Sequence, residues 1–229
     1  ETSHHETGPG QNEIDFKYSE ICKAADNLAT FKITVATIAA QDGLHSSFSP
    51  KPLKDQAGSG LHLNLSLNEK GVNITNLENK KTKSFIAGIL RRIREITLFL
   101  NPLKESYDRL GYFEAPKYVS YSSQNRSQLI RLPPATGQQM RLELRSPDPS
   151  CNQYLAMAFV IAAGLEGIKD SLDLEPSVDI NLFTAPAEKI KDLQSLPENL
   201  GEAIELASSS DFVKSLIPEE VLKAYIKHI

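Results

Sequence analysis

Apolar residues recur along this chain at two spacings, and each spacing predicts a different kind of element. Helical spacing runs through residues 17–43, 84–100 and 152–172, where an apolar position returns every three or four residues. The third segment is apolar on nearly all sides until Glu166, which predicts a deeply packed helix. Two shorter helices are expected near residues 200–207 and 218–228. The charged positions of the second helix are expected to face solvent: Arg91, Arg92, Arg94 and Glu95.

Strict alternation of apolar and polar residues predicts three strands. In residues 61–67 the leucines share one face, and the other face carries His62, Asn64 and Ser66. In residues 141–145 two leucines lie opposite Arg141, Glu143 and Arg145.

A third, shorter strand is expected over residues 127–132 and carries Arg131. Strands that lie between helices, with short links, predict an α+β fold with a mostly antiparallel sheet and flanking helices. The proline-rich residues 175–197 have no clean period and are expected to form a peripheral loop.

The composition narrows the classes of function. The 229 residues are 40% hydrophobic, enough to bury a sizeable core. A net charge of −4 and a pI near 5.8 argue against a general nucleic-acid binder or a membrane-surface protein. The longest apolar run, residues 154–164, is shorter than the ~20 residues that a membrane helix needs. We therefore expect no nucleic acid and no membrane among the partners.

Cys22 and Cys151 are the only cysteines, and both lie in apolar, helix-like stretches. Reduced, buried thiols are the expected state of such residues in a cytoplasmic protein. The sequence therefore predicts a cytoplasmic location.

The first residues of the chain hold a candidate metal site. Two histidines and two acids surround the bend Gly8-Pro9-Gly10, namely His4, His5, Glu6 and Glu13. Acids on the two sides of a tight bend can converge, as hard divalent cations require of oxygen ligands.

The polar face of the strands is the second candidate for chemistry. Arg141, Glu143 and Arg145 could form a solvated face, whose ion pairs would contribute little to stability. In the alternative interpretation the face is covered, its arginines bind anions and Glu143 binds a cation. Three nearby features favour this alternative: the turn Gly58-Ser59-Gly60 just before His62, the run Asn125-Arg126-Ser127 with Arg131, and Arg109 ahead of a loop with Glu114.

The number of arginines decides between reaction classes. Guanidinium forks suit carboxylates and phosphates alike. The candidate site has five arginines, more than one small carboxylate needs: Arg109, Arg126, Arg131, Arg141 and Arg145. Carboxylates with one histidine suit Mg²⁺ or Mn²⁺ better than zinc. Together these groups predict phosphoryl transfer to an acid substrate. The chain has no Walker-type phosphate loop and no serine in a nucleophile elbow, so a nucleotide would need another architecture.

The order of the motifs resembles the catalytic region of type I glutamine synthetase. The matching blocks are HHETGPGQNEIDF, AADN, PKP, GSGLHLNLSL, ESYDRL, EAP, NRSQLIRLP, RLELRSPDPSCNQYLA and AAGLEGIK. They extend to about Leu172. The resemblance implies the glutamine synthetase and guanidino kinase-like catalytic fold, and ligation of ammonia to glutamate with ATP through γ-glutamyl phosphate. It also implies two divalent metal ions, Mg²⁺ or Mn²⁺, and a homo-oligomer of two hexameric rings, a dodecamer.

The resemblance also implies a role for each matched residue. The metal nearer glutamate would be bound by Glu6 and Glu13, and the metal nearer the ATP phosphates by His62 and Glu143. Glutamate would be held by Gly58, Arg109 and Arg145. The transferring phosphoryl group and the nucleotide would contact Asn64, Ser66, Arg126, Arg131 and Arg141. Glu114 would lie on a flap that shields the intermediate from water and helps to deprotonate ammonium.

The chain departs from the family pattern in several places. Ala57 replaces the asparagine of an Asn-Gly-Ser-Gly turn, and residues 105–116 are one residue shorter than usual, with Glu105 and Asp108 replacing Asn and Lys. By the resemblance, residues 1–229 would be a catalytic domain that lacks the N-terminal β-grasp domain, the first catalytic strands with a Glu-x-Glu metal pair, the ammonium-binding aspartate and a C-terminal segment. The fragment alone is therefore expected to be inactive. Two alternatives stay open: a γ-glutamyl-polyamine or amine ligase, and a non-catalytic structural or regulatory module.

Overall fold

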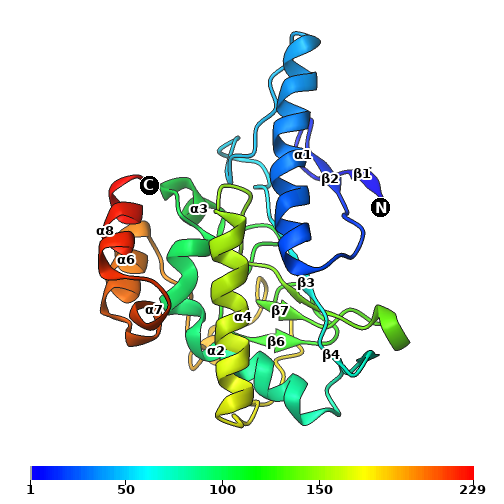
Figure 1. Ribbon diagram of the computed structural model, residues 1–229, viewed down its shortest axis with the longest axis vertical. Coiled ribbons are helices and arrows are strands. Elements are labelled where there is room, and N and C mark those ends of the chain that lie inside the picture. Colours follow the sequence, from blue (N-terminus) through cyan, green and yellow to red (C-terminus); the bar gives the residue numbers. More distant parts are fainter. Residues whose placement is uncertain (1) are drawn as a thin grey trace.

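The computed structural model describes residues 2–229 and contains helices packed against small sheets (Figure 1). The helices are α1 (Ile21–Gln41), α2 (Lys80–Leu100), α3 (Lys104–Arg109), α4 (Gln153–Lys169), α5 (Ala187–Ile190), α6 (Leu200–Ser209), α7 (Asp211–Leu216), α8 (Glu219–Lys227) and one 3₁₀ turn, η1 (Gly137–Gln139). The strands are β1 (Ser3–His5), β2 (Asn12–Ile14), β3 (Leu63–Leu65), β4 (Asn68–Glu69), β5 (Val72–Asn73), β6 (Tyr121–Ser122), β7 (Ile130–Arg131) and β8 (Leu142–Leu144). The α+β prediction is confirmed.

The largest sheet in residues 2–229 has the order β3-β8-β7-β6. The β3–β8 and β7–β8 pairs are antiparallel and β6–β7 is parallel, so the sheet is mostly antiparallel as predicted. Each strand is shorter than its alternating pattern suggests. On the two sides of β3 the backbone N–H groups donate to acceptors outside the sheet: Leu61 donates to the Pro147 carbonyl, and Leu67 to the Thr75 hydroxyl. The regular pairing of this strand ends there. The leucines of the predicted apolar face, Leu63, Leu142 and Leu144, are buried in the core.

The centre of the core is the contact between α2 and α4. Three glycines let the two helices approach closely: a Cβ on Gly88 would lie 2.2 Å from the Ala163 carbonyl oxygen, and one on Gly167 would lie 2.1 Å from the Ser84 carbonyl oxygen. A Cβ on Gly164 would overlap the Phe85 ring at 2.2 Å. Backbone therefore lies against backbone along this contact, and the apolar character of α4 is explained by its burial.

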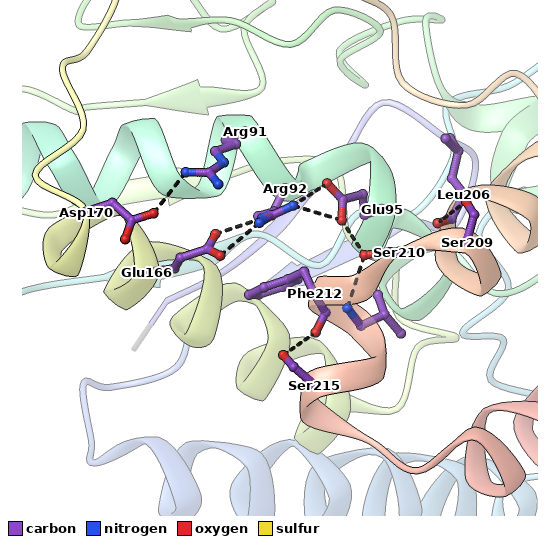
Figure 2. A network of polar contacts seen from close by, with 11 residues as sticks. Arg91, Arg92, Glu95, Glu166, Asp170, Leu206, Ser209, Ser210, Phe212 and Ser215 are labelled. Carbon is purple, nitrogen blue, oxygen red and sulfur yellow. Dashed lines mark hydrogen bonds and ion pairs between the residues drawn. The ribbon is translucent and has the colours of Figure 1, made fainter.

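The charged side of α2 does not face open solvent as expected. Arg92 makes a bidentate contact with Glu166 of α4, at 2.7 and 2.8 Å, and also binds Glu95 at 2.9 Å. Figure 2 shows this network continuing from Glu95 to Ser210 at the start of α7. Arg94 binds Glu202 of α6 at 2.6 Å. Arg91 is exposed as expected, but the expectation was wrong for Arg92, Arg94 and Glu95. The reason is that α4, α6 and α7 supply acids and a hydroxyl from distant parts of the sequence.

The α1 helix is sparsely covered for its 21 residues. It extends away from the body beside the β1–β2 hairpin (Figure 1), and only Ala25 and Leu28 are buried in it. Cys22 in its first turn is exposed and Cys151 is buried, so the prediction of two buried thiols is right for Cys151 alone.

Residues 175–197 line the edge of the sheet more closely than a peripheral loop would. They contain α5, Val178 donates to the Tyr121 carbonyl, and Tyr118 forms a bridge with Ser195. Across residues 2–229 we find no helix with both the length and the apolar character to cross a membrane.

Candidate functional site

Glu143 of β8 is the centre of the candidate site. The register of the sheet places Asn64 of β3 opposite Glu143 on one side and Arg131 of β7 opposite it on the other. Arg145 directly follows β8, and His62 directly precedes β3. The alternation of the sequence therefore brings one carboxylate, one imidazole and two guanidinium groups to one face of the sheet.

The contacts of Glu143 fix its charge. Its Oε1 lies 3.3 Å from His62 Nδ1 and accepts from Arg145 Nη1 at 3.2 Å, and its Oε2 accepts from Arg131 Nη1 at 3.3 Å. Burial alone would raise the pKa of Glu143, but the hydrogen bond with His62 and the charges of Arg145 and Arg131 lower it to about 2. Burial also lowers the pKa of His62. Glu143 is therefore ionised at neutral pH, and His62 is neutral and able to act as a ligand.

Arg109, at the end of α3, is a third guanidinium at this site. It is 3% exposed, and it donates to the Ser146 carbonyl at 2.8 Å and to the Arg145 carbonyl at 3.1 Å. Burial lowers its pKa to about 10, against the opposing effect of Asp148. The guanidinium is thus charged at neutral pH, and two backbone carbonyls fix its orientation.

The glycine turn lies directly over Arg109. A Cβ on Gly60 would come within 2.7 Å of Arg109 Nη2 and 3.0 Å of His62 Nε2, and one on Gly58 within 2.4 Å of the Pro50 carbonyl oxygen. Only glycine lets the backbone approach these groups so closely. This requirement explains the glycines at both positions of the turn.

The loop after α3 brings Glu114 to Arg145. Gly111 at φ +84° and Phe113 at φ +55° turn the chain back, and Gly111 donates to the Ala115 carbonyl at 3.1 Å. The Glu114 carboxylate then lies 3.7 Å from Arg145 Nη2 and is 66% exposed in its side chain. Glu114 is therefore at the mouth of the site, between Arg145 and solvent.

The N-terminal hairpin forms a second group of candidate ligands. Donor atoms of His4, Glu6 and Glu13 lie within 4.8 Å of one another. Burial raises the pKa of Glu13, and the neighbouring Glu6 carboxyl raises it further. This is expected when two carboxyl groups lie next to each other. The Gln11 side-chain amide donates to the Gly58 carbonyl at 3.0 Å and ties this hairpin to the glycine turn.

The predicted metal ligands do not all lie on one sheet. Glu13 belongs to β2, in a separate two-stranded sheet, because the Gly-Pro-Gly bend closes the segment into a hairpin of its own. The same hairpin brings in His4, which lies opposite Glu13 in the register. His4 belongs to the candidate site at the start of the chain, but it is not among the ligands that the resemblance implies. The symmetry of the segment about its bend could have indicated this pairing.

The remaining predicted residues lie further out. Arg141 is exposed and its Nε donates to the Asn64 side-chain oxygen at 3.1 Å, so it does not join Glu143 and Arg145 as the alternation suggested. It precedes β8 rather than belonging to it. Arg126 is exposed on a loop held by the Ser122 hydroxyl, and within residues 2–229 its side chain has no recorded hydrogen bond. Ser66 is half-buried just after β3.

The sum of charges decides what this site can bind. Arg131 and Arg145 flank the carboxylate of Glu143, and Arg109 lies beside the Arg145 backbone in the same largely buried setting. Planar guanidinium forks of this kind suit carboxylates and phosphates. Two clusters with carboxylate and imidazole donors lie on either side of the glycine turn.

Comparisons with known proteins identify the family of this chain. A sequence profile of the glutamine synthetase catalytic domain matches residues 1–228. Glutamine synthetases of Methanosarcina mazei and Clostridium saccharobutylicum are each 44% identical over 99% of this chain, and one of Staphylococcus aureus is 41% identical. The chain spans about half the length of these relatives, 53% in each case.

Solved structures give the same result. A structure of GmaS in complex with ADP has a TM-score of 0.89 at 30% identity and covers 99% of this chain and 54% of its own. The glutamine synthetase of Plasmodium falciparum has a TM-score of 0.87 at 25% identity and covers 100% of this chain and 54% of its own. The chain therefore belongs to the glutamine synthetase catalytic-domain family.

Proposed function

We propose that this chain is the greater part of the catalytic site of an ATP-dependent ligase that joins ammonia to L-glutamate and releases L-glutamine, ADP and phosphate. One observation carries the proposal: two guanidinium groups flank the carboxylate of Glu143, and a third, that of Arg109, lies between the Arg145 backbone and the glycine turn. Membership of the family supports the same reaction. In it the γ-carboxylate of glutamate attacks the γ-phosphoryl group of ATP, and ammonia then displaces phosphate from the γ-glutamyl phosphate.

Each substrate has residues suited to it. Arg109 and Arg145 bind the carboxylates of glutamate, and the Gly58 backbone accepts from its amino group. Arg131, with Arg126 and Arg141 further out, offsets the negative charge of the phosphoryl group as it is transferred. Asn64 and Ser66 contact the nucleotide, whose binding is supported by the ADP in the GmaS structure. Glu114 closes the mouth against water.

The donor chemistry fits divalent cations at two places. Glu6 and Glu13, with His4 beside them, would hold one Mg²⁺ or Mn²⁺, and His62 and Glu143 would hold the other. Bound there, the ions would neutralise phosphate oxygens. The raised pKa of Glu13 supports this assignment, because two acids so close together favour a cation between them.

Several expectations stay predictions. They are the division of the chain as a truncated catalytic domain, the assembly of the complete protein into two hexameric rings, and its cytoplasmic location. The acids Glu105 and Asp108, both exposed on α3, favour an amine or polyamine acceptor as the second candidate function.

The complete protein that carries this sequence is the right material for a test, because the chain spans half the length of its relatives. The test supplies glutamate, ATP and Mg²⁺ with either ammonia or a panel of amines, and follows products by mass spectrometry. We expect glutamine from ammonia. A higher kcat/KM with an amine would select the second function, and no product with any acceptor would refute both and support the non-catalytic alternative.

A further inference from the structure

The position of Arg109 depends on a buried turn behind the site. Its guanidinium donates to the carbonyl oxygens of Arg145 and Ser146, at 3.1 and 2.8 Å, and makes no ion pair with any carboxylate in residues 2–229. Both carbonyls belong to the turn that follows β8. If this turn moves, the Arg109 guanidinium must move with it to keep both hydrogen bonds.

Two buried side chains fasten this turn to the end of α2. The Asn101 amide nitrogen donates to the Ser146 carbonyl at 2.8 Å and to the Asp148 carboxylate at 2.9 Å. An amide NH₂ has two donors, so both are used here. The Asp148 backbone N–H donates to the Leu100 carbonyl at 3.1 Å, and Leu61 donates to the Pro147 carbonyl at 2.8 Å. Asn101 and Asp148 are each 0% exposed.

The buried charge of Asp148 needs stabilisation from its surroundings. Its other hydrogen bonds come from the backbone and hydroxyl of Ser150, so every recorded donor is neutral. A buried carboxylate with only neutral donors is costly unless a nearby cation offsets it. Arg109 and Lys32 are such cations: Asp148 acts against the effect of burial on the pKa of each. The carboxylate and the guanidinium therefore stabilise each other across the turn.

We propose that Asn101 and Asp148 are positioning residues for substrate binding: they fasten the turn of residues 145–148 to α2 and so hold the guanidinium groups of Arg109 and Arg145 where a substrate carboxylate meets them. The inference rests on the proposed function. Neither residue touches the substrate in this account. Both act through the backbone carbonyls that orient Arg109.

The kinetic test uses two variants in the complete protein, Asp148→Asn and Asn101→Ala. The first removes the charge and sets an amide against the Asn101 amide, and the second removes both donors that hold the turn. A misplacement near 1 Å costs up to about a hundredfold in rate, so we expect the glutamate KM to rise about tenfold or more. The ATP KM should change less than about threefold, because Asn64 and Ser66, which contact the nucleotide in the proposed function, lie on β3 and just after it.

The matched control is Arg94→Met on the same helix. This change removes the ion pair between Arg94 and Glu202, two partly buried side chains that lie apart from the site. It therefore destabilises the packing of α2 without altering the turn of residues 145–148. It should lower the melting temperature but leave the ratio of the two KM values unchanged. If Arg94→Met shifts that ratio as much as the two variants do, or if the two variants leave it unchanged, the positioning role is refuted.

A crystal structure of Asp148→Asn separates this proposal from the proposed function. If the wild-type protein makes no product, the reaction is wrong, but the structure still tests the turn. Displacement of the Arg109 guanidinium from the Ser146 carbonyl would support the positioning role. An unmoved Arg109, with its hydrogen bonds to the turn intact, would overturn it.

Discussion

Gly60→Ala should damage substrate binding while leaving the fold almost intact. The new methyl group would lie 2.7 Å from Arg109 Nη2 and 3.0 Å from His62 Nε2. Both neighbours are side-chain ends, so they rather than the backbone must give way. To reach an ordinary contact, the guanidinium must move by about 0.7 Å.

The size of the effect follows from that displacement. Moving Arg109 Nη2 strains its hydrogen bond to the Arg145 carbonyl, which is already 3.1 Å long. A misplacement of this order costs about ten- to a hundredfold in kcat/KM. The free energy of unfolding should fall by only about 1 kcal/mol, the low end of the cost of adding a methyl group to a well-packed region.

The assay is steady-state kinetics on the complete protein with glutamate and ATP varied in turn, together with urea unfolding. Gly201→Ala in the first turn of α6 is the matched control, because its Cβ would meet only the Asn199 side chain, at 3.1 Å. Gly201→Ala should change neither KM. Unaltered glutamate kinetics in Gly60→Ala would refute the claim that Arg109 contacts the substrate beneath this turn.

Three other substitutions test separate parts of the account. Arg145→Lys should raise the glutamate KM about ten- to over a hundredfold in steady-state assays, because the loss of a charge-assisted hydrogen bond costs about 1.5–3 kcal/mol, and an equal rise in the ATP KM would contradict the assignment. Gly167→Ala should destabilise the protein by about 1–3 kcal/mol in urea unfolding, because its Cβ would lie 2.7 Å from the Gly88 Cα and this overpacking outweighs the ~1 kcal/mol gain in helix propensity. A more stable variant would show that α2 and α4 can separate without cost. The hydrogen bond from Arg92 lowers the pKa of Glu166. The contribution of this ion pair to stability is therefore fully present at pH values above the ordinary pKa of a glutamate, and it is lost as the pH falls through the lowered pKa. Glu166→Gln should therefore cost about 1.5–3 kcal/mol at neutral pH and progressively less below about pH 4 in melting experiments, whereas a cost independent of pH would contradict this.

Local periodicity was enough to predict the main face of the site. Alternation within residues 61–67, 127–132 and 141–145 placed leucines in the core, and in the structure His62, Arg131, Glu143 and Arg145 meet on the other side. This worked because the side-chain period of a strand is fixed by the backbone. The same argument overreached at Arg141, where the regular strand has not yet begun.

Features that depend on contacts between distant segments could not be predicted. Arg92 meets Glu166 across 74 positions of sequence, and Asn101 meets Asp148 across 47. Nothing local to α2 distinguishes an arginine that meets solvent from one that meets an acid of another helix. His4 is different, because its place opposite Glu13 follows from hairpin geometry about the Gly-Pro-Gly bend.

The most direct test of the central claim asks whether the arginine-lined site transfers a phosphoryl group to glutamate. The complete protein is incubated with Mg²⁺, glutamate and ATP that carries oxygen-18 in its β–γ bridge, in the absence of ammonia. Reversible formation of γ-glutamyl phosphate lets the β-phosphate of ADP rotate before ATP re-forms. We predict that the label moves to non-bridging positions only when glutamate is present, and that Arg145→Lys slows this exchange. No exchange, or exchange independent of glutamate, would contradict the account.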